Sequence, residues 1–286
     1  MISDITRGQF FPGFSPLHKL DPRTKIILAI ASIVAVFFAN NPVSFALITL
    51  ATLSMIIVSR ISLKVVLKGI KPLIIILIFT AVLNVFMTGG EGEPLVEFWI
   101  FSIYTEGIVR AVYMALRVVL LIIITSMFLT YTTSPISLTD GLESLLSPLK
   151  LIKIPVHTFA MMMSIALRFI PTLVEETEKI MNAQKSRGAD FSSGGLIKRA
   201  KALVPILIPL IVSSFKRAED LATAMECRCY RGDKKRTKLV KLQFKWRDIL
   251  WFISFAVFVA VVILSTILPY RFDVSSLIYD IIFYKV

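Results

Sequence analysis

The chain has 286 residues, of which 56% are hydrophobic, and a formal net charge of +13. Soluble globular domains are about 45–50% apolar, and apolar runs of membrane length are rare in them. The composition therefore excludes an ordinary soluble domain and indicates a polytopic membrane protein. Residues 1–16 lack the continuous apolar core of a cleavable signal peptide, so we expect the first transmembrane helix to direct insertion.

Proline and glycine signals divide the apolar sequence into five predicted transmembrane helices. Asp21 followed by Pro22 is typical of a helix N-terminus, and Asn41 followed by Pro42 repeats this signal. A helix of about 18 residues is roughly 27 Å long, which nearly matches the thickness of the hydrocarbon layer. The predicted spans are residues 22–39, 42–59, 69–88, 106–131 and 248–268. The sequence thus predicts an all-α polytopic membrane protein.

Lysine and arginine are distributed unevenly along the chain, and their distribution predicts its orientation. Residues 132–247 hold twenty of the 32 Lys and Arg, whereas loop 89–105 has none and carries three glutamates. The positive-inside rule places the N-terminus and residues 132–247 in the cytoplasm of a cell-membrane protein, and loop 89–105 outside. Within that loop, residues 94–104 are aromatic and β-prone, which predicts a short external hairpin, an interfacial strap or a simple loop in contact with lipid.

This orientation predicts three parts of the chain. Residues 1–131 form an N-terminal membrane domain of four transmembrane helices. Residues 132–247 form a cytoplasmic or interfacial coupling domain of about three amphipathic helices, and residues 248–286 contain the last transmembrane helix and an external tail. The three amphipathic helices are predicted at residues 138–147, 156–185 and 196–229.

The second and third amphipathic helices each combine an apolar part with a polar end. The third is expected to be interrupted or bent near Pro205 and Pro209. The second is apolar up to Pro171 and polar after it. Its apolar part includes Met161, Met162, Met163, Phe169 and Ile170. Methionine in a helix either fills a core or provides an adaptable surface for a partner, and the sequence leaves both interpretations open.

Two similar motifs lie near the ends of these two helices. Each places one arginine between small residues: Ser186–Arg187–Gly188 and Cys227–Arg228–Cys229. The planar guanidinium group can donate two parallel hydrogen bonds to a carboxylate, and small neighbours would let a partner's groove close around it. The alternative is that both arginines are solvated or contact lipid headgroups. The recurrence of the same context 41 residues apart strengthens the case for docking onto a soluble partner, but the residues by themselves leave both interpretations open.

No catalytic or metal site is predicted in this chain. Cys227 and Cys229 lie two positions apart without a nearby histidine, which suits neither a zinc site nor an internal disulfide. His18 and His157 do not have the spacing of a zinc protease motif. The phosphate-loop pattern G-x-x-x-x-G-K-[ST] is absent from the sequence, so ATP hydrolysis, if it is involved, belongs to a partner. The basic run 231–247 suits anionic lipid headgroups better than nucleic acid.

The two arginine motifs resemble the Ala-Arg-Gly-like coupling motifs of the EcfT/CbiQ family, the transmembrane T components of energy-coupling factor (ECF) transporters. The outer residues of both triplets depart from Ala and Gly, but they remain small. The resemblance covers about residues 15–237, and further similar stretches lie at residues 15–25, 132–135, 166–171 and 216–219.

The resemblance implies a non-catalytic subunit of an ATP-driven importer. Arg187 and Arg228 would each dock into one of two cytoplasmic EcfA-type ATP-binding-cassette subunits, which hold ATP and Mg, so this chain itself would need no cofactor. The apolar surface formed by Met161–Met163, Phe169 and Ile170 would contact a small membrane S component that binds a vitamin or a transition-metal ion such as cobalt or nickel.

Two other functions compete with this one: a self-contained permease and an intramembrane enzyme. Both need polar groups that converge within the membrane, and the spans offer little beyond Asn84 and Arg117. For Arg117 we expect a structural role, with pairing inside the helix bundle.

Overall fold

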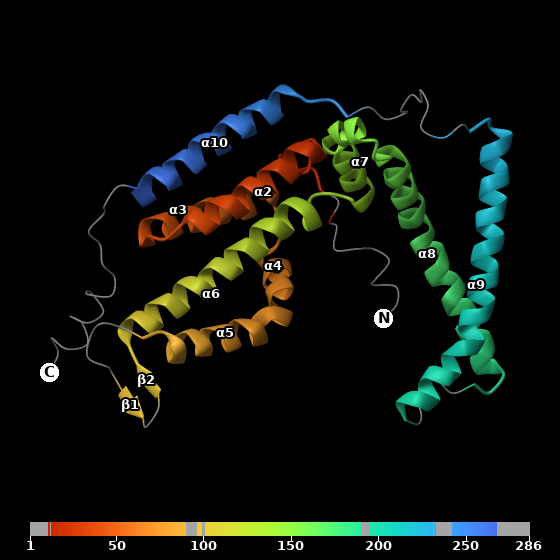
Figure 1. Ribbon diagram of the computed structural model, residues 1–286, viewed down its shortest axis with the longest axis horizontal. Helices are drawn as coiled ribbons and strands as arrows, with labels where there is room; N and C mark the ends of the chain where they lie inside the picture. Colours follow the sequence, from red (N-terminus) through yellow and green to blue (C-terminus); the bar gives the residue numbers. More distant parts are fainter. Residues whose placement is uncertain are drawn as a thin grey trace. The chain divides into compact units, whose positions relative to one another are not determined.

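The computed structural model describes residues 11, 13–89, 96–98, 101–189, 191, 195–230, 232 and 242–267 (Figure 1). The predicted external tail, the first ten residues, part of the external loop and most of the basic run 231–247 lie outside the described residues. The helices are α2 (Pro22–Phe38), α3 (Pro42–Ser59), α4 (Leu63–Ile70), η1 (Lys71–Leu73), α5 (Ile74–Met87), α6 (Thr105–Thr125), η2 (Ser126–Tyr131), α7 (Pro135–Leu145), η3 (Ser147–Ile152), α8 (Val156–Ser186), α9 (Leu196–Cys227) and α10 (Trp246–Ile267).

The chain divides into two compact units. The helix-bundle unit comprises residues 10–134 and 242–286 and contains α2 to α6 with α10. The crossed-helix unit comprises residues 1–9 and 135–241 and contains α7, α8 and α9. The division into domains predicted from the sequence stays a prediction.

The helix starts predicted from Asx–Pro pairs are confirmed. Asp21 is the N-cap of α2, and its carboxylate accepts a hydrogen bond from the backbone N–H of Arg23 at 2.9 Å. Asn41 precedes α3 but makes no cap bond with its side chain. Its amide instead donates to the backbone oxygen of Ser265 in α10 at 3.1 Å, which ties the start of α3 to the end of α10.

The third predicted span begins earlier than expected and is not uniform. The helical segment starts at Leu63 rather than at Gly69, and it runs through α4, η1 and α5 to Met87. Pro72 lies in η1, where the helix tightens to 3₁₀ geometry, because proline has no N–H to donate to the preceding turn. The predicted start at residue 69 therefore lies near the change from α4 to η1 and not at the start of the helical segment.

The fourth predicted span is α6, which continues into the π-helical turn η2 and ends at Tyr131 as expected. The π turn frees a carbonyl from the regular helical pattern. The hydroxyls of Thr132 and Thr133 both donate to the backbone oxygen of Phe128, at 3.1 and 2.7 Å. These bonds end the helix just before Ser134–Pro135.

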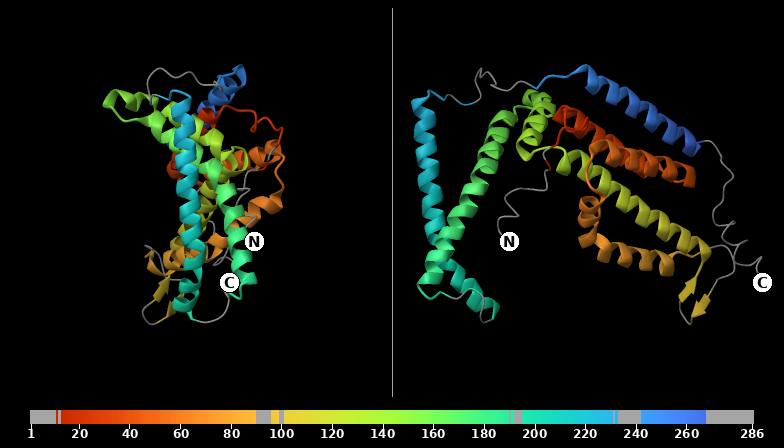
Figure 2. Two further views of the ribbon diagram at one scale, coloured as in Figure 1. Left: turned by 90° about the vertical axis from the view of Figure 1, so that its right-hand side faces the viewer. Right: turned by 180° about the vertical axis from the view of Figure 1, so that it is seen from behind.

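The core of the helix-bundle unit is centred on α2, which packs against α6 and α10 (Figures 1 and 2). Buried side chains from α2, α3, α6, η2 and α10 meet there: Leu28, Ala29, Val36, Phe45, Ile48, Leu120, Ile124, Phe128 and Val262. Between α5 and α6, the predicted external segment forms a hairpin whose strands β1 (Val96–Phe98) and β2 (Phe101–Ile103) pair antiparallel. Of the three alternatives, the hairpin is confirmed, and its external location stays a prediction.

Five helical segments of the described chain are long and apolar enough to cross a membrane, as predicted in number. They are residues 42–59, 63–87, 105–131, 156–186 and 246–267. The set differs from the prediction in two members. Helix α8, predicted to lie in the coupling domain, qualifies by length and composition, whereas α2 has 17 residues and is one residue shorter than α3. A 17-residue helix is about 25 Å long, the lower limit for a membrane span.

A buried lysine joins the start of α2 to the end of η2. Lys25 is 2% exposed, and its ammonium group donates to the backbone oxygens of Thr132 at 2.7 Å and His18 at 3.3 Å. On the same end of α2, the carboxylate of Asp248 accepts from the backbone N–H groups of Asp21 and Lys245, at 2.9 and 2.8 Å. Three segments far apart in the sequence are thus linked through charged groups.

We expect Lys25→Met to lower the thermal stability of the purified chain, because the buried oxygen of Thr132 would lose its donor. An unsatisfied buried acceptor costs about 1–3 kcal/mol. Thermal unfolding in detergent should show a midpoint several degrees below that of the wild type. Lys19→Met is the matched control, since Lys19 is exposed. An unchanged midpoint for Lys25→Met, or an equal fall for the control, would contradict this role.

Candidate functional site

The candidate site is built on α8 and α9, the two longest helices of the crossed-helix unit. Both contain proline, and of the two expected outcomes for α9, an interruption or a bend, the structure shows the bend. Helix α9 remains helical through Pro205 and Pro209, as α8 does through Pro171. Figure 1 shows the N-terminal part of α9 at an angle to the rest of the helix. All three prolines are exposed, which leaves the freed carbonyls accessible to polar groups.

The two helices are joined where they cross by one ion pair. The guanidinium group of Arg217 in α9 donates to the carboxylate of Glu176 in α8. Both side chains are partly exposed, at 38% for Arg217 and 23% for Glu176. This pair is the only salt bridge between α8 and α9 in the part of the chain that the structure describes.

Next to the ion pair the crossing helices enclose an apolar groove. Its volume is about 290 Å³. The lining residues, apart from Ser214 and Arg217, are apolar: Ile165, Phe169, Leu173, Ala218, Leu221, Ala222 and Met225. The groove explains the three- and four-residue spacing of apolar side chains in α9, since this stripe faces α8.

Helix α8 ends in a Schellman motif with Arg187 as its C-cap. Gly188 follows in the left-handed conformation, with a φ of +86°. Its N–H donates to the oxygen of Lys185 at 2.9 Å, and the N–H of Ala189 donates to the oxygen of Gln184 at 3.0 Å. This pair of bonds defines the motif and satisfies two carbonyls at the end of the helix.

Helix α9 ends in the same motif with Arg228 as its C-cap. The N–H of Cys229 donates to the oxygen of Glu226 at 2.8 Å, and the N–H of Tyr230 donates to the oxygen of Met225 at 3.0 Å. The left-handed position is occupied here by Cys229, with a φ of +56°. The backbone angles of the two caps agree as well: φ −87° and ψ 6° for Arg187, φ −89° and ψ 14° for Arg228.

The two arginines also lie at the same distance along their helices from the crossing. Arg187 follows Glu176 by 11 residues, and Arg228 likewise follows Arg217 by 11 residues. At 1.5 Å per residue each tip is about 17 Å from the ion pair. The crossed-helix unit therefore carries two equivalent arginine tips at equal reach.

The structure does not bring the two arginine tips together. Figure 1 shows α8 and α9 running past each other in roughly opposite directions, so their C-terminal ends lie at different ends of the crossing. Arg187 and Arg228 are both exposed, and neither forms a hydrogen bond or ion pair through its side chain within the described residues. All other members of the two predicted triplets are exposed too: Ser186, Gly188, Cys227 and Cys229.

The predicted apolar contact surface divides between two environments. Met162, Met163 and Ile170 are exposed, at 54%, 41% and 42%. Phe169 lines the groove with α9, and Met161 is half-buried. The methionines therefore contribute both to the packing of α8 and to an exposed apolar surface. Within the described residues, no cluster of His, Cys, Asp and Glu is arranged to hold a metal ion.

The comparisons with known proteins decide the family. The model of the CbiQ family, described as cobalt transport protein, matches residues 13–239. The chain belongs to the CbiQ/EcfT family. Curated relatives named energy-coupling factor transporter transmembrane protein EcfT are similar over nearly their whole length. The protein from Clostridium kluyveri is 52% identical over 93% of this chain and 98% of its own, and that from Bacillus subtilis is 48% identical over 91% and 97%.

Sequence reasoning found both arginine tips and the family but missed two features of the site. The first is the Glu176–Arg217 ion pair, whose residues are 41 positions apart, as Arg187 and Arg228 are. A search for oppositely charged residues at the separation of the two arginine motifs could have identified this pair. The left-handed conformation of Cys229 was also missed, because glycine, not cysteine, is the usual sign of such a cap.

We expect Cys229→Gly to stabilise the end of α9, because a side chain in the left-handed region costs about 1 kcal/mol and glycine avoids most of this cost. Hydrogen–deuterium exchange should show the amides of residues 229 and 230 exchanging about threefold more slowly than in the wild type, which corresponds to roughly 0.6 kcal/mol.

The matched control is Cys227→Gly, which changes the same residue type two positions earlier. Cys227 is the last residue of α9. Glycine there should weaken the helix end by up to about 1 kcal/mol and speed exchange of the same amides. If both variants shifted exchange in the same direction, the cap geometry would not be the cause.

Proposed function

We propose that this chain is the coupling subunit of an ECF-type importer. In this role it links ATP hydrolysis by two cytoplasmic ATPase subunits to reorientation of a membrane S component that binds a vitamin or transition-metal ion. The observation that carries the proposal is the equivalence of the two arginine tips, with the same cap and the same reach from one ion pair. Two equivalent tips suit a partner with two equivalent sockets. Membership of the CbiQ/EcfT family supports the same conclusion.

Each tip is suited to docking by the geometry of its cap. The Schellman motif ends the helix at the arginine, so the guanidinium group extends from the end of a rigid rod. Small residues flank both arginines, and a groove lined with carboxylates can therefore enclose the tip. A guanidinium–carboxylate pair buried in this way is costly to break, at about 3–5 kcal/mol when one partner is removed. Such contacts are strong enough to transmit motion from an ATPase to α8 and α9.

The exposed apolar surface of α8 would receive the S component. Met162, Met163 and Ile170 belong to the N-terminal half of α8, on the opposite side of the Glu176 ion pair from the Arg187 tip. Methionine side chains adapt to a partner that changes orientation, because they are unbranched and flexible. A movement of the tips would thus be passed through the crossing to the bound S component.

We infer that residues 132–247 face the cytoplasm and that α8 lies along the membrane surface rather than across it. The dense positive charge of this region supports the orientation. Helix α8 is the least apolar of the five candidate spans, and its second half carries three glutamates and two lysines. Helix α2, although short, then provides the first crossing. In this arrangement the chain needs no catalytic residue or cofactor, since ATP and Mg belong to the ATPases.

We expect the double charge reversal Arg187→Glu and Arg228→Glu to abolish transport while leaving membrane insertion intact, because both tips would repel the acidic sockets of the ATPases. Co-purification with the tagged chain, read by mass spectrometry, should lose the ATPases. Uptake by the reconstituted complex, measured with the substrate of the S component that co-purifies with the wild type, should stop. Each single reversal should reduce uptake less than the pair does, since one tip still holds.

The matched control reverses one exposed lysine on each helix, with Lys179→Glu and Lys216→Glu. It changes the net charge by the same amount and should retain both ATPases. Normal uptake by the double arginine variant, or loss of the ATPases in the lysine control, would refute docking through the tips.

A second experiment tests the crossing rather than the tips. Glu176→Arg and Arg217→Glu should each reduce uptake several-fold, because each places two like charges at the crossing, whereas the two changes together restore the pair in reverse. All three variants should still co-purify the ATPases, since Arg187 and Arg228 are intact. Failure of the combined variant to recover uptake while the chain remains folded would show that the ion pair does not link the two helices functionally.

A further inference from the structure

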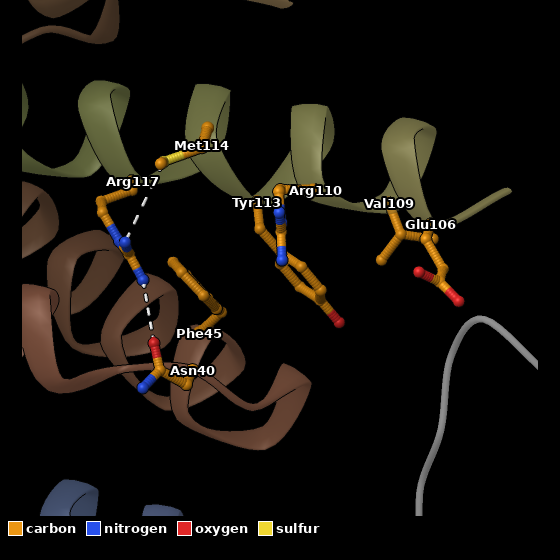
Figure 3. Close-up of a pocket in the computed structure, with 8 residues that line it drawn as sticks. All are labelled: Asn40, Phe45, Glu106, Val109, Arg110, Tyr113, Met114 and Arg117. Atoms are coloured by element: carbon orange, nitrogen blue, oxygen red, sulfur yellow. Dashed lines mark hydrogen bonds between the residues drawn. The ribbon is translucent and has the colours of Figure 1, made fainter. Parts of the chain in front are cut away.

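The helix-bundle unit contains a pocket that the proposed coupling function does not use. It has a volume of about 400 Å³ and lies between α6 and the turn that joins α2 to α3 (Figure 3). Six of its lining residues belong to α6. Figure 3 shows the side chains of Arg110, Tyr113 and Arg117 projecting from the same side of this helix. The lining residues are Asn40, Phe45, Glu106, Val109, Arg110, Tyr113, Met114 and Arg117.

Arg117 is held at one end of the pocket by neutral groups alone. Its guanidinium group donates to the backbone oxygen of Ala39 at 2.6 Å and to the side-chain oxygen of Asn40 at 3.3 Å. It also lies over the ring of Phe45, with 5.6 Å between the guanidinium carbon and the ring centroid. Its Nε atom is buried without a hydrogen-bond partner within the described residues. The positive charge is therefore oriented but not compensated.

Arg110 adds a second positive charge to the same pocket. It precedes Arg117 by seven residues, two helical turns, so both arginines lie on one face of α6 about 10 Å apart along the axis. Arg110 is exposed and makes no hydrogen bond or ion pair within the described part of the chain. With Glu106 as the pocket's one carboxylate, two positive charges and one negative charge leave a net charge of +1.

An arginine within a membrane-spanning helix is costly, and such residues pair with other charged groups or with backbone carbonyls, or mark a site for an ion or substrate. The described carboxylates provide no partner within ion-pair distance of Arg110 or Arg117. We propose that this pocket binds the phosphate group of an anionic phospholipid, held between the two arginines. The fork of a guanidinium group matches the oxygens of a phosphate, and a phosphodiester with a charge of −1 balances the pocket.

The size and lining of the pocket favour a lipid over free inorganic phosphate. A volume of about 400 Å³ is in the range of pockets for small organic ligands and exceeds what one phosphate group fills. Beside the polar groups, the pocket offers apolar surface from Val109, Met114 and the stacked rings of Phe45 and Tyr113, whose centroids are 5.1 Å apart. This surface suits the glycerol backbone and the first carbons of the acyl chains.

The test measures lipid binding to the purified full chain by native mass spectrometry. Three probes are titrated separately: dioleoyl phosphatidylglycerol, dioleoylglycerol, which lacks the phosphate, and inorganic phosphate. We expect the first phosphatidylglycerol to bind at least tenfold more tightly than dioleoylglycerol, and inorganic phosphate at tenfold excess not to displace it. Arg110→Gln with Arg117→Gln should weaken the binding of this first lipid roughly tenfold or more, because charge-assisted hydrogen bonds are lost.

Lys64→Gln with Lys68→Gln is the matched control, since it removes two exposed positive charges four residues apart on α4. It should leave the affinity of the first lipid within about twofold of the wild type. Arg110→Gln alone also tests the proposal if loss of Arg117 prevents folding, because Arg110 forms no bond within the described chain, and it should weaken binding several-fold.

Four outcomes would overturn the proposal. They are wild-type affinity in both the double variant and Arg110→Gln, equal loss in the lysine control, equal binding of dioleoylglycerol, and displacement of the lipid by inorganic phosphate. The last result would identify a site for free oxyanions instead. The proposal stands or falls separately from the coupling function, because none of these variants changes Arg187 or Arg228.

Discussion

The architecture of the crossed-helix unit depends on one ion pair, between Glu176 and Arg217. Two helices of 31 and 32 residues pass each other there, and the apolar groove beside the pair is their main further contact surface. Because both partners are partly exposed, the pair contributes modestly to stability, in the range of 0–1 kcal/mol typical of surface salt bridges. Its main effect is on geometry, since it fixes the point along each helix at which the crossing occurs and hence the reach of each tip.

The two tips reach the same backbone geometry from different sequences. In α8 the left-handed residue after the arginine is Gly188, for which this conformation carries no steric penalty. In α9 it is Cys229, which adopts the conformation at a cost, yet the pattern of hydrogen bonds at the end of the helix is the same. The orientation of the arginine is therefore set by the backbone cap rather than by the identity of its neighbours. This explains how the second motif departs from glycine without losing its form.

Much of the fold could be predicted from local signals, because a membrane span is encoded by length and apolarity and its ends by Asx–Pro pairs. The bounds of α3 and the start of α2 follow directly from Asn41–Pro42 and Asp21–Pro22. Features that depend on partners distant in sequence could not be predicted. Lys25 looks like a surface residue at the start of a helix, and only the packing of η2 against α2 buries it against Thr132. Length and composition alone also do not decide whether α8 crosses the membrane, because by both measures it qualifies as a span.

A joint made of one exposed ion pair and an apolar groove is suited to motion in a way that the rest of the molecule is not. In the helix-bundle unit, charged groups such as Lys25 and Asp248 are buried and bonded to backbone groups from several segments, so displacement would leave polar groups unpaired. At the crossing, a change in the angle between α8 and α9 can separate Glu176 from Arg217. Water then solvates both charges, so the free-energy cost of breaking this pair is small. The groove between Phe169 and Leu221 tolerates a change in the crossing angle because apolar contacts have no direction. The chain thus places its weakest interactions at the crossing, where the proposed coupling function requires motion.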